Sequence, residues 1–173
     1  MSFEPRLLDT MSAVETFEVS LPDGTLKTLP AGSTSLDLAQ GIGSRLAKAA
    51  VAAVVDGVET DLTVALAAGA KVSIITAESE AGRHVLRHST AHVMAQAVVQ
   101  LFVGAKFTIG PAIEDGFYYD FELPGGKTFS DTDLAAITER MREIIKADQS
   151  FTRDEMSVKA ALELFADQPY KCE

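Results

Sequence analysis

Two strands joined by a tight turn are predicted directly from residues 16–28. Phe17, Val19 and Leu21 alternate with polar residues, which is the period of a strand with one buried face. Pro22-Asp23-Gly24 comes next, and these residue types favour a turn between two strands. Because an isolated hairpin is only marginally stable in water, the chain must supply further strands or a helix to cover it.

The following residues supply both. Thr34 or Ser35 is placed to cap a short helix. The apolar runs 51–55 and 72–75 are then predicted to be short strands. Two strands, a helix and further strands over about 60 residues predict a β-grasp (ubiquitin-like) domain at 14–76.

A second domain follows, and together the two make an α+β chain. Residues 1–13 are predicted to be an N-terminal tail, and the small, polar residues 77–83 a linker. The second domain is placed at 84–173. A long proline-free helix is predicted at about 80–103, and strands are predicted at 107–109 and 117–123. Two further helices are predicted to begin at the capping residues Ser130 and Ser157. Because these strands lack partners, we expect the domain to be truncated.

Composition and charge exclude several classes of protein. The 25 acidic and 15 basic residues give a net charge of −10, which argues against a generally basic nucleic-acid wrapper or a polybasic membrane binder. Non-specific binding of tRNA should be weak and sensitive to salt. Cys172 is the one cysteine of the sequence, so a disulfide framework is excluded. With neither a secretory signal nor a long apolar run in the sequence, we predict a cytoplasmic protein.

Three histidines stand four residues apart in the predicted long helix. His84, His88 and His92 therefore form one stripe, and the last two make an HxxxH motif. The stripe points away from the apolar face that contains Met94 and Val98, so it suits the wall of a cleft. Two imidazoles at this spacing can hold a water molecule or a metal ion.

A simpler interpretation stays open: the histidines are solvated or bonded locally, because HxxxH alone is a weak signal. Position 89 is serine rather than glutamate, which disfavours a metalloprotease. Tyr118 and Tyr119 are adjacent in a predicted strand, so one should face the core and the other should face away. The outward one could bind a substrate hydroxyl or could simply pack on the sheet.

Several motifs occur in an order that resembles a known family. Residues 87–92 (RHSTAH) followed by 110–120 (GPAIEDGFYYD) look like the editing domain of bacterial threonyl-tRNA synthetases. Upstream, residues 21–24 (LPDG), 37–39 (DLA), 55–57 (VDG) and 61–62 (DL) resemble the TGS domain at the start of those enzymes. The similarity in order and spacing runs from about Val14 to Glu173.

This resemblance implies an enzyme with two activities. The family attaches threonine to its tRNA using ATP, and its editing domain hydrolyses tRNA mischarged with serine. A second site is needed because one methyl group provides only about 1–3 kcal/mol of discrimination. By resemblance, His88, His92 and Lys171 are the catalytic residues of this pocket, and Tyr119 binds the substrate. His84 lies outside the family motif.

The resemblance also predicts what this stretch lacks. The family pocket is completed by a downstream Cys-x-x-x-His element, which is not in this sequence. We therefore expect these residues alone to edit poorly or not at all and to have no ligase activity. No metal is predicted at the histidines. ATP, magnesium and zinc, the threonine-specific tRNA and a homodimer are expected for the full-length enzyme. Two alternatives stay open: a free-standing deacylase of mischarged tRNA, and a non-enzymatic RNA- or protein-binding module.

Overall fold

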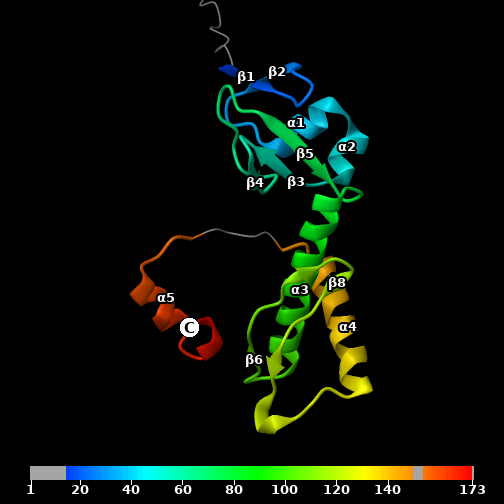
Figure 1. Cartoon of the computed structure of the whole chain (residues 1–173), viewed down its shortest axis with the longest axis vertical. Helices are drawn as coiled ribbons and strands as arrows, with labels where there is room; N and C mark the ends of the chain where they lie inside the picture. Colours follow the sequence, from blue (N-terminus) through cyan, green and yellow to red (C-terminus); the bar gives the residue numbers. More distant parts are fainter. Residues whose placement is uncertain (1–14, 150–153, 173) are drawn as a thin grey trace, which may run out of the picture. The chain divides into compact units, whose positions relative to one another are not determined.

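A computed structural model describes residues 15–149 and 154–172, and these fall into two compact units that divide after Gly82 (Figure 1). The predicted tail, residues 1–13, lies outside the described residues. Within the described ranges, no helix has the length and apolar character needed to cross a membrane.

The first unit begins with the predicted hairpin. Strand β1 (Thr16–Ser20) pairs antiparallel with β2 (Leu26–Pro30), and Val19 lies opposite Lys27. In the turn, the backbone N–H of Thr25 donates to the Asp23 carboxylate at 2.9 Å. Gly24 adopts a φ of +83°, a conformation that glycine reaches without steric cost.

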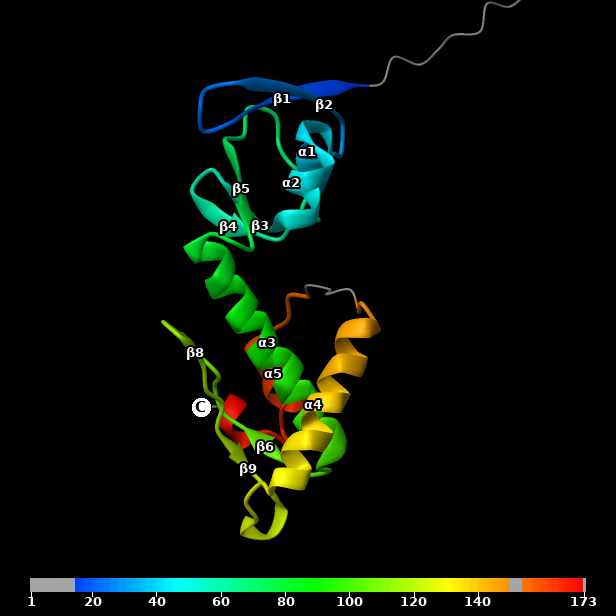
Figure 2. The ribbon, with the colours of Figure 1, turned by 90° about the vertical axis from the view of Figure 1, so that its right-hand side faces the viewer.

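A second sheet completes the first unit. Its order is β4-β3-β5, with β3 in the centre, and both pairings are antiparallel. The bounds are β3 (Ala50–Val55), β4 (Val58–Thr60) and β5 (Val72–Thr76). A parallel bridge between Ser20 and Lys71 connects the first sheet to the second. Figures 1 and 2 show these strands and the adjoining helices from two directions.

Helix α1 (Ser35–Ile42) covers this sheet. Thr34 caps it, because the Thr34 side chain accepts the Asp37 N–H while the Asp37 carboxylate accepts the Thr34 N–H. Leu38 points into a core shared with Val19, Leu29, Ala53, Leu66, Ala70 and Val72, and Ala39 is buried as well. A second short helix, α2 (Ser44–Ala49), follows at once and was not predicted, because none of its residues is buried.

The second unit is built around α3 (Glu80–Leu101), which begins within the first unit. Helix α4 (Asp131–Lys146) lies beside it in both views (Figures 1 and 2). Four short strands follow α3: β6 (Lys106–Phe107), β7 (Ala112–Ile113), β8 (Gly116–Phe117) and β9 (Phe121–Glu122). Strand β6 pairs with β9, and β7 pairs with β8. The other elements of this unit are η1 (Pro124–Gly126), α5 (Val158–Leu164) and η2 (Pro169–Lys171). The buried core residues are Ala97, Val98, Ala105, Leu123, Ile137 and Ile144.

One predicted element differs from the structure, and one predicted helix start agrees with it. The helix predicted from about residue 80 begins at Glu80, within the range 77–83 named as a linker, because the Ser79 hydroxyl accepts the Gly82 N–H and starts α3 there. The strand predicted at 117–123 is instead two short strands separated by residues 118–120. Its first part forms a tight hairpin with β7, whereas its second part pairs with β6.

Candidate functional site

The two histidines of the HxxxH motif are in contact on α3. Their Nε2 atoms lie 3.0 Å apart, and the ring centroids are 4.6 Å apart with the planes at 76°. A contact of this kind needs an N–H on one ring facing a lone pair on the other. One of the two imidazoles must therefore stay neutral as long as the pair is intact.

A hollow of about 500 Å³ opens beside this pair. Three of the four predicted site residues line it, namely His92, Tyr119 and Lys171. The other lining residues are Ala95, Gln96, Val99, Phe107 and Phe165. His88 joins the group through its contact with His92, whereas His84 is not part of this lining. The structure thus places the four residues together, and their chemical roles stay predictions.

Tyr119 reaches the hollow from the irregular segment between β8 and β9. Its ring stacks on Phe121 at a centroid distance of 5.1 Å and meets Phe107 edge-on at 6.2 Å. Burial raises the pKa of the Tyr119 phenol, so the hydroxyl keeps its proton and can donate a hydrogen bond. Tyr118, by contrast, is 53% exposed. Tyr119, the more buried of the two, therefore faces the hollow.

Lys171, near the end of the sequence, is held by Phe107 of β6 and by Thr108, the residue that follows β6. Its Nζ donates to the Thr108 carbonyl at 2.7 Å and lies 4.9 Å from the centroid of the Phe107 ring. A cation over an aromatic face is attracted by the negative charge of that face. The ammonium group therefore has a fixed place beside the hollow, where it could stabilise a developing negative charge.

The environment keeps His92 neutral. Burial lowers the pKa of His92 below the ordinary 6.5, and the neighbouring charges of His88 and Lys171 lower it further. A neutral imidazole can accept a proton, which a general base for water must do.

This pKa shift predicts a pH profile. Because the pKa of His92 lies below 6.5, its protonated form should appear only on acidification below that value. An NMR titration of the His92 ring should show a midpoint below 6.5, and His88→Ala should move it upward by removing one of the lowering charges. A midpoint at or above 6.5 in the unmodified protein would contradict this description of the site.

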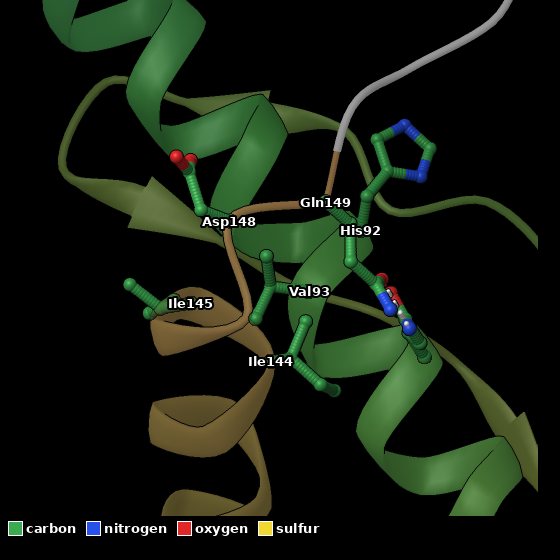
Figure 3. A pocket seen from close by; sticks show the side chains of 7 residues that line it. His92, Val93, Ile144, Ile145, Asp148 and Gln149 are labelled. Carbon is green, nitrogen blue, oxygen red and sulfur yellow. Dashed lines mark hydrogen bonds between the residues drawn. The ribbon is translucent and has the colours of Figure 1, made fainter.

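A second, smaller hollow of about 200 Å³ lies on the other side of His92, between α3 and the end of α4. Figure 3 shows Val93 of α3 and Ile144 of α4 next to each other in its wall. At its rim the amide of Gln96 donates to that of Gln149 at 3.0 Å. His92 and Gln96 line both hollows, so they form the partition between them.

The Tyr119 ring packs directly against the backbone of Gly110. A Cβ at this position would overlap the Tyr119 ring, although the Gly110 backbone itself is not in the left-handed region. Gly110→Ala should therefore displace Tyr119 and lower any activity of the site about 100-fold, the usual effect of a misplacement near 1 Å. Gly116→Ala is the matched control, because a Cβ there would have open space. Equal activity in the two variants would show that the position of Tyr119 is unimportant.

The donor set does not match an ordinary zinc site. Across residues 15–149 and 154–172, no three His, Cys, Asp or Glu side chains gather closely enough to hold a metal ion. Zinc sites in proteins use three or four such ligands. The Nε2 atoms of His88 and His92 instead contact each other directly at 3.0 Å.

Comparison with known proteins identifies the first unit and relates most of the chain to one family of ligases. Residues 17–76 match the TGS domain family. The threonine–tRNA ligase of Citrifermentans bemidjiense is 52% identical over 147 residues, which is 85% of this chain. Those of Geobacter sp. strain M21 and Rubrobacter xylanophilus are 50% and 46% identical over 157 and 155 residues, in each case 90% of this chain. The chain matches the N-terminal part of threonine–tRNA ligases.

The resemblance seen in the sequence motifs is thereby confirmed for the family and for the TGS domain. The chain covers 23–24% of these threonine–tRNA ligases, about a quarter of their length. Sequence motifs alone did not reveal the roles of Phe107 and Gln96 in the site. Phe107 falls in a predicted strand and Gln96 in the predicted long helix, and no local pattern connects them with the histidines.

Proposed function

We propose that this protein is a threonine–tRNA ligase, and that residues 84–173 contribute to a site that hydrolyses tRNA mischarged with serine. The single observation that carries the proposal is the shared hollow: His92, Tyr119 and Lys171 line it, from segments far apart in the sequence. The similarity to threonine–tRNA ligases over 85–90% of the chain supports the substrate class.

Each side chain has a role in ester hydrolysis that its surroundings support. Neutral His92 accepts a proton from the attacking water, and His88 orients the His92 ring through the 3.0 Å contact. The Lys171 ammonium stabilises the oxyanion that forms on the ester carbonyl. The Tyr119 hydroxyl, which keeps its proton, binds the serine side chain by a hydrogen bond.

The remaining predictions concern the protein at its native length. We propose that ATP, magnesium and zinc bind to the full-length enzyme outside these residues. We further propose that the threonine-specific tRNA is the partner, that the enzyme forms a homodimer, that it works in the cytoplasm and that the present stretch alone has no ligase activity.

A charging reaction with the wrong amino acid tests the proposal. The native-length protein is supplied with ATP, serine and the threonine-specific tRNA, and the accumulated seryl-tRNA is measured. The unmodified protein should accumulate almost none, whereas a His88→Ala/His92→Ala variant should accumulate it while charging threonine normally. No difference between the two proteins would refute the editing role.

A further inference from the structure

Gln168 lies three residues before Lys171 and bridges a backbone group of β6 and one of the residue that precedes β6. Its side-chain Oε1 accepts the Phe107 N–H at 3.3 Å, and its Nε2 donates to the Ala105 carbonyl at 3.2 Å. Residues 105 and 107 point their backbone groups to the same side of a strand, because the side alternates at every residue. One planar amide thus occupies an edge of β6 as a paired strand would.

The bridge holds Phe107, one of the two residues that contact the Lys171 ammonium. Phe107 supplies the ring beneath the ammonium, and its own N–H is bound by Gln168. The Gln168 carbonyl in turn accepts the Lys171 N–H at 2.8 Å, which closes the turn η2. Loss of the bridge would therefore release η2 from β6 at the point where the Lys171 side chain crosses to Thr108.

A third contact connects the η2 turn to β9 rather than to β6. The Tyr170 hydroxyl donates to the Glu122 carboxylate on β9 at 2.6 Å, and both groups are exposed. An exposed contact of this kind holds a segment weakly compared with the half-buried amide bridge of Gln168. The Gln168 bridge therefore ties the start of the η2 turn to β6 and to the residue that precedes β6.

We propose that Gln168 is a positioning residue for Lys171: it fixes the ammonium beside the hollow without touching the substrate. This inference rests on the proposed hydrolysis of seryl-tRNA. Length and chemistry both matter, because asparagine is one methylene too short to bridge both groups. Glutamate has the right length but lacks the N–H donor and places a negative charge against the Ala105 carbonyl.

A double-mutant cycle on the native-length protein tests the proposal. Gln168→Ala and Gln168→Glu should each lower kcat for hydrolysis of seryl-tRNA about tenfold, with little change in KM, because only the stabilisation of the oxyanion is weakened. In a Lys171→Ala background, Gln168→Ala should cause no further loss. Gln100→Ala, an exposed glutamine on α3, is the control and should behave as the unmodified protein. An equal loss from Gln168→Ala in both backgrounds would overturn the proposal.

A second readout separates this proposal from the proposed function. The Phe107 ring should shift the NMR signals of the Lys171 side chain, since the ammonium lies over it. This shift should disappear in folded Gln168→Ala and Gln168→Glu, whether or not the protein hydrolyses seryl-tRNA. Retention of the shift in both variants would overturn the positioning role, whereas its loss in a protein without hydrolysis would refute only the proposed function.

Discussion

Replacing His92 with alanine is expected to reduce hydrolysis of seryl-tRNA by about 10²–10⁴-fold, the usual contribution of a positioned general base. His92 lines the hollow with Tyr119 and Lys171, and its lowered pKa keeps the imidazole neutral and able to accept a proton. The rate constant would be measured with preformed seryl-tRNA and the native-length protein.

Companion variants make this result specific. His88→Ala should cause a smaller loss, because His88 acts on the hollow through its 3.0 Å contact with His92. His84→Ala should hydrolyse seryl-tRNA normally, since His84 lies on the same helix but outside the lining of the hollow. All three variants should attach threonine to tRNA at the normal rate. A His84→Ala defect as large as that of His92→Ala would indicate damage to α3 rather than loss of a base.

The second large effect is expected in the core of the first unit. Leu38 is 1% exposed and packs among the buried side chains of both sheets, so Leu38→Ala removes apolar contacts and leaves a cavity. Such a change typically lowers the free energy of unfolding by about 2–5 kcal/mol. Hydrogen exchange of the β1 and β5 amides, measured in the native-length protein, should rise accordingly.

The matched control for this change is a leucine at the surface of the same unit. Leu26 begins β2 and is 59% exposed, so Leu26→Ala should change stability by no more than about 0.5 kcal/mol. If Leu26→Ala and Leu38→Ala accelerated exchange equally, the assignment of the core around Leu38 would be wrong.

Elements fixed by local chemistry could be predicted from the sequence. Thr34 and Ser130 both form capping boxes, with Asp37 and Asp133, because the partners are only three residues apart. The hairpin and its Asp23 turn were predicted for the same reason. Partners distant in sequence were not predicted: the stretch from Phe117 onward divides between two different strands, β7 and β6, that no local pattern specifies.

The site divides in the same way. Helical periodicity alone predicted that His84, His88 and His92 share one face of the helix, because four residues make about one turn, and of the three His92 lines the hollow. Strand alternation left Tyr118 and Tyr119 open, and the family resemblance pointed to Tyr119. Lys171 came only from that resemblance. Gln168 was missed altogether, since it contacts Phe107 across 61 residues and glutamine in a polar segment carries no signal of its own.

The most direct test of the editing role compares two esters of one tRNA. The threonine-specific tRNA is charged with serine or with threonine, and single-turnover hydrolysis by the native-length protein is followed for each. We predict that the seryl ester is cleaved faster by at least about tenfold, the scale of discrimination that one methyl group allows. Cleavage of neither ester above the rate in buffer, or equal cleavage of both, would contradict the proposed editing site.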